Sequence, residues 1–416
     1  MAIESDVLVV GGGLAGCVAA LSAADDGATV RVVTGGASTL RQASGLLDVL
    51  GYHDGALVSD PFTVLTDLPV GHPYERVGLE AVRAGLDRFD DAVSGYAGGH
   101  TDNNALVPTV GGSVKPTARY PCRVAAGLAS RPADTLLVGF ETLVDFDAPL
   151  AADHLERTGV PFDVSGITVG FPADLRADAA TTRYARALDR DERVREVLAS
   201  VVEPHAGAVD RVGFPAVLGT DRHETVRETL ESRLDVSVFE IPTGPPSLLG
   251  TRLETSLYEA LDAATVRLDA GVSVVGYEAD ESGGRIDHVL VERPNQIVPH
   301  HAAEFVLATG GLVGKGIDSD RHGVREPVFD CHVPHPADRY DWFEPDAFGE
   351  HPFARFGVDV DRELRPRDAH GRIEHTNLRA VGSVLGGADF AAEKSGGGIS
   401  LATGHRAGTL AAEEAR

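Results

Sequence analysis

Lysine is nearly absent from this chain of 416 residues. It occurs only at Lys115, Lys315 and Lys394, so the other 34 of the 37 basic residues (37 − 3) are arginine. Acidic residues number 63, and the formal net charge is −26. The sequence shows no basic face, which argues against a nucleic-acid partner. The excess of carboxylates favours a protein adapted to high salt, where screening removes their mutual repulsion.

Cysteine clusters and long apolar runs are also missing. The three cysteines, Cys17, Cys122 and Cys331, stand far apart and offer no zinc, iron–sulfur or disulfide spacing, which fits a reducing cytoplasm. No apolar run approaches the roughly 18 residues of a membrane span. Glu4 and Asp6, close to the N-terminus, do not suit a secretory leader. We therefore expect a cytoplasmic chain without a membrane span of its own.

A glycine-rich turn near the start predicts nucleotide binding. Residues 3–10 form an apolar, β-branched run, and GGGLAG follows with Gly11, Gly13 and Gly16 in the G-x-G-x-x-G spacing. An Ala-rich helix then ends near Gly27, and ATVRVVT at 28–34 predicts a second strand. In such a unit the glycines let the backbone approach a phosphate at the helix N-terminus.

The second half of the same domain is expected far downstream. Leu253, Leu257 and Leu261 have helical spacing, and two alternating strands with a Ser-Gly-Gly turn follow, then the buried strand EFVLATGG. Near the C-terminus a strand should end at 382–383, and the glycines at 396–398 should begin the last helix. This order resembles that of the two-dinucleotide-binding-domain flavoproteins.

We therefore predict an α/β fold with a Rossmann-type flavin-binding domain. Residues 1–59 and 246–416 form that domain, and residues 60–245 form an inserted α+β cap or substrate domain. The insertion contains the candidate strands ADTLLVGF and RVGFPAVLG and a charged helical stretch, RYARALDRDERVREVLASVV. A chain of this length is expected to hold two domains.

Several further segments are more specific. They are SGLLDVL (44–50), HPY (72–74), LVDFDA (143–148), PPSLLGTRL (245–253), GVREPVF (323–329), FGVDVDRELRP (356–366) and VGSVLGGADF (381–390). In this order they resemble the B subunits of the anaerobic glycerol-3-phosphate dehydrogenases, nearly end to end. The resemblance implies oxidation of sn-glycerol 3-phosphate to dihydroxyacetone phosphate, with electrons sent towards a quinone. It also implies two partners, an FAD-bearing catalytic subunit and an iron–sulfur subunit that anchors the complex at the membrane. The chain would then reach the inner face of the cell membrane only through these partners.

One residue that an FAD site normally has is missing. About twenty residues after a dinucleotide turn, an Asp or Glu usually binds the ribose hydroxyls. Here the second strand ends in Val33, Thr34, Gly35 and Gly36, with no carboxylate. The resembling family is described as binding FMN, which has no adenosine. We predict FMN, with FAD as the alternative in which Thr34 or an acid elsewhere contacts the ribose.

The predicted flavin site collects the glycine turns and their neighbours. Its residues are Gly11, Gly13, Gly16, Thr34, Ser44, Gly45, Gly382, Ser383, Lys394, Gly396, Gly397 and Gly398. The last helix would direct its positive N-terminal dipole at the flavin. Lys394 and Lys315 lie beside glycines and are predicted to face phosphate groups.

The candidate catalytic residues are His72 as a base, and Arg325 and Arg365 as anchors for the substrate phosphate. A surface turn for His72 and salt bridges for the arginines remain open. Cys331, His332 and His335 resemble a metal half-site, but nearby prolines and the lack of a second cluster favour a loop, so no metal is assigned. Three interpretations remain: a flavin-bearing dehydrogenase subunit, a flavoprotein that relays electrons, and a scaffold that has lost its cofactor.

Overall fold

The computed structural model describes residues 3–36, 38–176, 179–281 and 283–416. By compactness the chain divides into two units. The first unit comprises Met1–Thr39, Asp48–Ser94 and Thr255–Arg416, and the second comprises Leu40–Leu47 and Gly95–Glu254. Residues 60–94 thus group with the first unit, while the assignment of residues 60–245 to a cap or substrate domain stays a prediction. Among the described residues, no helix combines the length and apolarity needed to cross a membrane.

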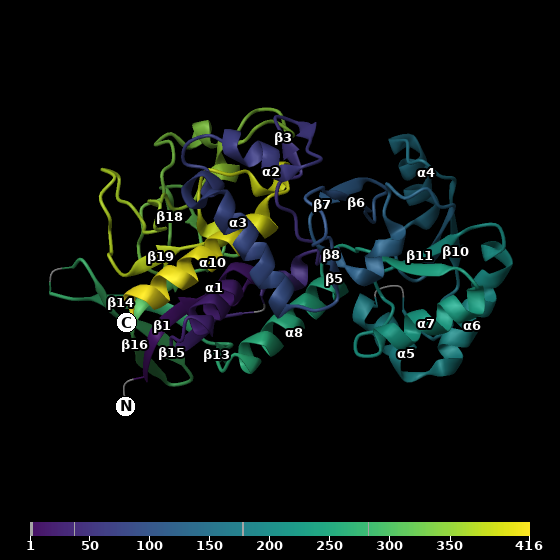
Figure 1. Cartoon of the computed structure of the whole chain (residues 1–416), viewed down its shortest axis with the longest axis horizontal. Coiled ribbons are helices and arrows are strands. Elements are labelled where there is room, and N and C mark those ends of the chain that lie inside the picture. The colour runs from purple at the N-terminus through teal and green to yellow at the C-terminus, as the bar shows by residue number, and fades with distance from the viewer. Residues whose placement is uncertain (1–2, 37, 177–178, 282) are drawn as a thin grey trace. The chain divides into compact units, whose positions relative to one another are not determined.

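The first unit is built on a seven-stranded sheet in the order β13-β2-β1-β16-β15-β14, with β19 also paired to β16 (Figure 1). β1 (Ile3–Val10) runs parallel to β2 (Val30–Thr34), and α1 (Leu14–Asp25) connects them. The predicted strand–turn–helix–strand unit is therefore confirmed. The C-terminal half of β1 is fully buried, as expected for a parallel strand covered on both faces.

β16 (Gln296–Leu307) belongs to two kinds of pairing at once. It runs parallel to β1 and antiparallel to β15 (Ile286–Arg293), which in turn pairs antiparallel with β14 (Ser273–Ala279). The predicted strands of this meander are confirmed, whereas Ser282 of the predicted turn lies outside the described residues. Edge strand β13 (Arg267–Ala270), which pairs with β2, and the short strand β19 (Leu378–Ala380), which pairs with β16, complete the sheet.

Two long helices of the first unit, α10 (Gly396–Glu414) and α1, approach each other through glycines. A Cβ at Gly404 would lie 2.5 Å from the carbonyl oxygen of Ala15, and one at Gly408 would lie 2.2 Å from that of Ala19. Only glycine permits this distance. The start of α10 at Gly396 confirms the predicted last helix. The other elements of the unit are α3 (Pro73–Ala92) and the short α2 (Pro61–Val64), α9 (Phe390–Glu393), β3 (Tyr52–His53), β4 (Ala56–Leu57), β17 (Asp318–Ser319) and β18 (Val324–Arg325).

The second unit contains a four-stranded parallel sheet. Its order is β10 (Val164–Val169), β9 (Thr135–Phe140), β11 (Arg211–Pro215) and β12 (Ser237–Ile241). The helices are α4 (Ala148–Thr158), α5 (Thr181–Arg190), α6 (Glu192–Ala206) and α7 (His223–Leu234). Short strands β5 (Tyr96–Ala97), β6 (Ala105–Pro108), β7 (Val114–Thr117) and β8 (Tyr120–Pro121) pair separately, and α8 (Leu248–Ala263) contains the boundary between the units. Helices alternate with parallel strands, a more regular arrangement than the α+β insertion expected.

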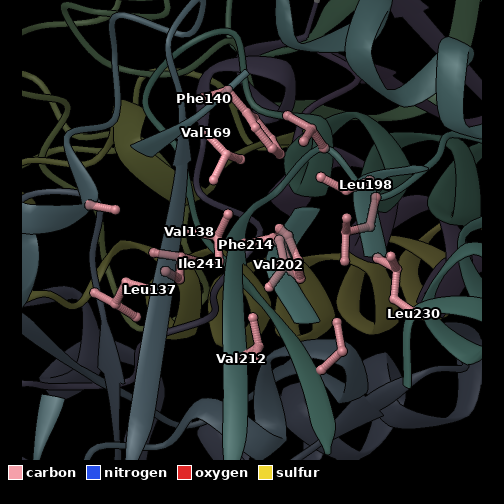
Figure 2. Packing of buried hydrophobic residues seen from close by; sticks show 14 of the residues in the cluster. Leu137, Val138, Phe140, Val169, Leu198, Val202, Val212, Phe214, Leu230 and Ile241 are labelled. Atoms are coloured by element: carbon pink, nitrogen blue, oxygen red, sulfur yellow. The ribbon is translucent and has the colours of Figure 1, made fainter. Parts of the chain in front are cut away.

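The core of the second unit joins the sheet to its helices (Figure 2). Phe140 of β9 and Phe214 of β11 are buried, and Leu198 and Val202 of α6 pack against the same cluster. Both strands predicted in the insertion are confirmed. The predicted helical stretch is broken into α5 and α6 at Asp191, whose carboxylate accepts a hydrogen bond from the Arg193 amide and caps the second helix.

Candidate flavin-binding site

Two glycines, one in the turn after β1 and one in the first turn of α1, leave no room for a side chain. Gly11 has a φ of +118°, and a Cβ there would lie 2.2 Å from the carbonyl oxygen of Ala308. A Cβ at Gly16 would lie 1.9 Å from the carbonyl oxygen of Gly11. The predicted glycines therefore bring β1, the turn and α1 into close backbone contact, as the G-x-G-x-x-G spacing requires.

The N-terminus of α1 is left without a side-chain cap. Gly13 occupies the N-cap position and makes no such bond, and a Cβ there would meet only the Thr39 hydroxyl, at 3.9 Å. The first amides of a helix have no partner within the helix and carry its positive dipole. An uncapped start with open space in front of Gly13 thus suits a phosphate group.

Thr34 and Tyr258 lie at the same turn. A Cβ at Gly12 would be 3.0 Å from the Thr34 Cβ and 3.0 Å from the Tyr258 hydroxyl oxygen. The Tyr258 hydroxyl lies 3.2 Å from the carbonyl oxygen of Gly12 and donates a hydrogen bond to it. The structure thus brings predicted Thr34 to the turn and adds Tyr258 of α8. This tyrosine was not predicted, because nothing in the helical spacing of α8 indicates what its polar face touches.

The ends of β16 and β19 converge beside α1. The Ser383 hydroxyl accepts a hydrogen bond from the Gly311 amide at 3.1 Å, and the Gly382 amide donates to the Thr403 hydroxyl at 2.9 Å. Gly382 has a φ of +72°, and a Cβ there would lie 2.7 Å from the Ala15 Cβ. The predicted pair Gly382–Ser383 is thus adjacent to the first turn of α1, although some 370 residues separate them in sequence.

The start of α10 forms a second uncapped helix N-terminus. Ser395 is the N-cap residue and makes no side-chain cap bond. The Gly398 amide donates to the Asp48 carbonyl oxygen at 2.6 Å, and a Cβ at Gly398 would lie 2.3 Å from the Tyr74 hydroxyl oxygen. Lys394 precedes this helix with a φ of +51°, and its ammonium donates to the Ala391 carbonyl oxygen.

His72 lies beside that helix start and is almost fully buried. Its Nδ1 accepts a hydrogen bond from the Tyr74 amide at 3.1 Å and caps α3, while its Nε2 lies 3.2 Å from a carboxylate oxygen of Glu393. Burial raises the pKa of Glu393, but the hydrogen bond and charge of His72 outweigh it and hold that pKa below its ordinary value. Both ring nitrogens of His72 therefore have partners, and its role as a base stays a prediction.

The two predicted arginine anchors are in ion pairs. Arg325 is exposed, and its Nη2 lies 2.9 Å from a carboxylate oxygen of Asp318. The Arg365 Nη2 lies 2.8 Å from a carboxylate oxygen of Asp361 and also contacts Glu363. Lys315 has a φ of +61° in the loop after β16. These ion pairs do not bring either arginine to the glycine turn, so their role as substrate anchors also stays a prediction.

Ser44 and Gly45 belong to the second unit. Gly45 has a φ of +74°, a Cβ there would lie 2.7 Å from the Leu249 Cβ, and its carbonyl oxygen accepts a hydrogen bond from the Tyr96 hydroxyl at 2.8 Å. Gly250 is similarly close, since a Cβ there would lie 2.0 Å from the Leu40 carbonyl oxygen. The family segments SGLLDVL and PPSLLGTRL therefore pack against each other, and a contact of Ser44 and Gly45 with flavin stays a prediction.

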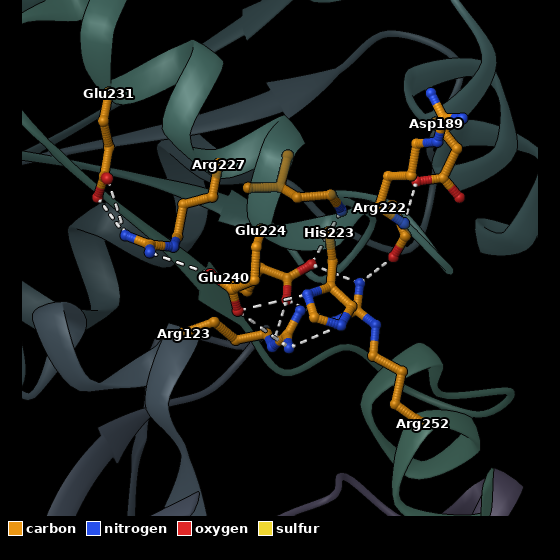
Figure 3. Close-up of polar contacts among 11 residues, drawn as sticks. Arg123, Asp189, Arg222, His223, Glu224, Arg227, Glu231, Glu240 and Arg252 are labelled. Atoms are coloured by element: carbon orange, nitrogen blue, oxygen red, sulfur yellow. Dashed lines mark hydrogen bonds and ion pairs between the residues drawn. The ribbon is translucent and has the colours of Figure 1, made fainter. Parts of the chain in front are cut away.

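The second unit also holds a charged network that was not predicted from the sequence (Figure 3). Buried Glu240 accepts hydrogen bonds from Arg252 at 2.6 Å and from the Leu218 amide at 2.9 Å, and the Arg123 guanidinium lies 3.7 Å away. Arg123 also contacts His223, where burial first and then the arginine charges lower the pKa of the imidazole. The members come from distant segments, so only the fold could assemble them.

A family model described as an FAD binding domain matches residues 6–400. A probable B subunit of anaerobic glycerol-3-phosphate dehydrogenase from Halobacterium salinarum is 57% identical over 425 residues, covering 99% of both chains. The chain belongs to this B-subunit family. A relative from Pectobacterium atrosepticum, also named as the B subunit of anaerobic glycerol-3-phosphate dehydrogenase, is 32% identical and covers 95% of this chain and 96% of its own length. The predicted family and fold class are thus confirmed.

Among solved structures, that of a 3-ketosteroid delta1-dehydrogenase from Sterolibacterium denitrificans is similar to the structure of this chain. It has 13% sequence identity, a TM-score of 0.47 and 99% coverage of both chains.

The prediction of FMN is wrong, because the matching family model is an FAD binding domain. The prediction relied on the missing carboxylate after β2, but that residue supplies only one contact of a dinucleotide. The parts that hold a diphosphate are in place: the glycine turn, the uncapped N-terminus of α1 and the open space at Gly13. The residues of the first unit therefore fit FAD, with Thr34 in place of an acid at the end of β2.

Proposed function

We propose that this chain is the FAD-bearing B subunit of an anaerobic glycerol-3-phosphate dehydrogenase. It takes part in the oxidation of sn-glycerol 3-phosphate to dihydroxyacetone phosphate, and its electrons pass through partner subunits towards a quinone. The observation that carries this proposal is the end-to-end similarity, at 57% identity, to a Halobacterium salinarum protein named as a probable B subunit. The glycine turn of the FAD-binding family gives it physical support, because both of its close backbone approaches are present.

The residues that would hold FAD divide between two helix starts. The amides at the start of α1, with Gly11, Gly13 and Gly16, would bind the diphosphate, and Thr34 and Tyr258 would face the adenosine side. Gly382 and Ser383, Lys394 and the glycines at 396–398 would face the flavin side. When bound, FAD would supply the hydride acceptor that oxidation of an alcohol needs. The chain's own residues would bind and orient the ring and keep water from it.

Partner subunits follow from the same chemistry. The chain's three cysteines, at 17, 122 and 331, stand far apart in the sequence, and this spacing does not suit an iron–sulfur relay. We assign the relay to an iron–sulfur subunit that also anchors the complex at the cytoplasmic face of the membrane. An FAD-bearing catalytic subunit would be the second partner.

A second candidate function is electron relay, in which a partner oxidises the substrate and this chain only passes electrons on. The observation that favours it concerns the predicted catalytic residues. His72 caps α3 and contacts Glu393, while Arg325 and Arg365 pair with carboxylates. All three are thus already engaged with other groups of the chain. The two candidates differ in whether glycerol 3-phosphate is oxidised by this chain alone.

The first experiment is to purify the chain in high salt, release the flavin and identify it by mass. FAD is the expected result, and a chain that takes up no flavin from an excess would overturn the proposal in favour of a scaffold. An assay with glycerol 3-phosphate and an artificial acceptor then separates the two candidates. Turnover by the isolated chain supports the dehydrogenase, whereas turnover only with the partner subunits supports relay.

One variant tests whether the FAD diphosphate binds at the start of α1. Gly13→Asp places a carboxylate at the start of α1, where there is room for it and where aspartate is a favourable N-cap. The fold should persist, while repulsion between like charges should deplete bound FAD. Gly207→Asp is the matched control, because it adds the same charge in open space at the end of α6. Full FAD content in Gly13→Asp would show that the turn does not hold the diphosphate.

A further inference from the structure

Two histidines and an aspartate meet on the antiparallel part of the first unit's sheet. Asp287 and His288 belong to β15, and His301 is the direct cross-strand partner of His288 on β16. One side-chain donor atom from each of the three lies within 4.8 Å of the others, and this is the only such group among the described residues. Residues so close in space but thirteen positions apart in sequence meet only because of the strand register.

The distances match the edges of a metal coordination sphere. The same Asp287 carboxylate oxygen lies 2.9 Å from the His288 Nδ1 and 3.4 Å from the His301 Nδ1. Tetrahedral zinc with ligands at about 2.1 Å has ligand atoms about 3.4 Å apart. The two rings are tilted by 42° with centroids 4.7 Å apart, so they are neighbours without being stacked face to face. The three donor atoms therefore require little movement to coordinate one ion.

A second carboxylate faces the other side of His288. Glu278 of β14 is the cross-strand partner of His288, and its carboxylate lies 3.7 Å from the His288 Nε2. Metal-ligating histidines commonly donate their other ring N–H to a carboxylate, which fixes the tautomer and the ring orientation. Glu278, His288 and His301 thus form one row across three strands. His288, in the middle of the row, is mostly buried, while Asp287 and His301 are more open to solvent.

We propose that Asp287, His288 and His301 bind a divalent transition-metal ion of the zinc class. The two imidazole nitrogens and one carboxylate oxygen suit Zn²⁺ and its neighbours rather than Ca²⁺ or Mg²⁺, which prefer oxygen ligands alone. Water occupies the fourth position, because the site opens to solvent at Asp287. The ion cross-links β15 and β16, and Glu278 acts as a positioning residue through the His288 Nε2. The site is separate from the glycine turn and does not rest on the proposed function.

The test is Zn²⁺ binding by the whole protein after treatment with a chelator, measured by competition with a chromophoric chelator. We expect one ion per chain, with at least about tenfold weaker binding in His288→Gln, His301→Gln and Asp287→Asn. His370→Gln is the matched control, since His370 is an exposed histidine of the same unit. Wild-type affinity in His301→Gln, or equal loss in the control, would overturn the assignment.

Two further readouts distinguish coordination from the plain hydrogen bonds that Asp287 can accept from both imidazoles. Zn²⁺ should raise the thermal midpoint of the wild-type protein and not that of His301→Gln, because an ion that binds only the folded state stabilises it. Glu278→Gln should weaken binding by about tenfold or more while keeping the stoichiometry of one. No rise in the wild-type midpoint at saturating Zn²⁺, with no measurable binding, would show that the three residues only hydrogen-bond to each other.

Discussion

Removing the charge of Glu240 should strongly destabilise the second unit, although the substitution hardly changes the size of the side chain. Glu240→Gln keeps the shape of the side chain but leaves Arg252 and Arg123 without their shared anion. The carboxylate is 1% exposed, accepts from Arg252 at 2.6 Å and lies 3.7 Å from Arg123. Breaking a buried ion pair from one side costs about 3–5 kcal/mol, because the remaining charge has no compensation. We expect a loss of that size in the unfolding free energy of the second unit.

The pH dependence has a definite sign. Burial would raise the pKa of Glu240, but the charge and hydrogen bonds of Arg252, followed by the charge of Arg123, hold it below its ordinary value. A lowered folded-state pKa gives stability that is present above the unfolded pKa of about 4.3 and is lost as pH falls through the folded pKa. The difference between wild type and Glu240→Gln should therefore be constant near neutral pH and shrink below about pH 4.

Hydrogen exchange measured by mass spectrometry suits this test, because it reports the opening free energy of β11 and β12 separately from the first unit. Glu231→Gln is the matched control. Glu231 forms an ion pair with Arg227 one turn away on α7 and is partly exposed. Loss of its charge should therefore lower the unfolding free energy by less than about 1 kcal/mol. High salt should reduce the control effect more than the Glu240 effect. Equal losses in the two variants would refute the reasoning.

Three other predictions concern packing and capping. Gly408→Ala should lower the free energy of unfolding by about 1–3 kcal/mol, because the new Cβ would lie 2.2 Å from the Ala19 carbonyl oxygen. Gly207→Ala is the control: its Cβ would enter open space, so the free energy of unfolding should stay the same or rise slightly. Urea unfolding measures both variants. Phe214→Ala should cost about 3–5 kcal/mol in the second unit, since the ring is fully buried, and an effect under about 1 kcal/mol would contradict the packing seen there. His72→Asn should keep the cap of α3 but lower the thermal midpoint, because His72 is almost fully buried and its loss leaves Glu393 without the imidazole partner; if turnover of the folded protein survives, His72 is not the catalytic base.

Local patterns account for the parts of the fold that were predicted from sequence. The βαβ unit follows from an apolar run, a glycine spacing and a helical run within about thirty residues, and each of these signals is a property of neighbouring residues. The same holds for the start of α10 at Gly396 and for the strands of the meander. The break at Asp191 was missed because both helices share one charged composition and only the cap separates them.

The error over the cofactor has a different origin. A missing carboxylate after β2 was treated as evidence against adenosine, but binding of a dinucleotide is shared among many contacts, most of them backbone amides. Backbone contacts leave little trace in side-chain identity. The structure instead identifies the positions where a Cβ has no room, as at Gly11 and Gly16. These positions can be recognised only when the position of the neighbouring backbone is known.

The sequence by itself determined the family, the Rossmann-type fold and the glycine turn, because these depend on order and spacing along the chain. Tertiary structure alone decided which polar side chains meet. It placed Tyr258 at Gly12, gathered Arg123 and Arg252 around Glu240, and put His288 beside His301. Such encounters depend on strand register and helix packing, and a shift of one residue in register would turn His301 to the opposite face of the sheet.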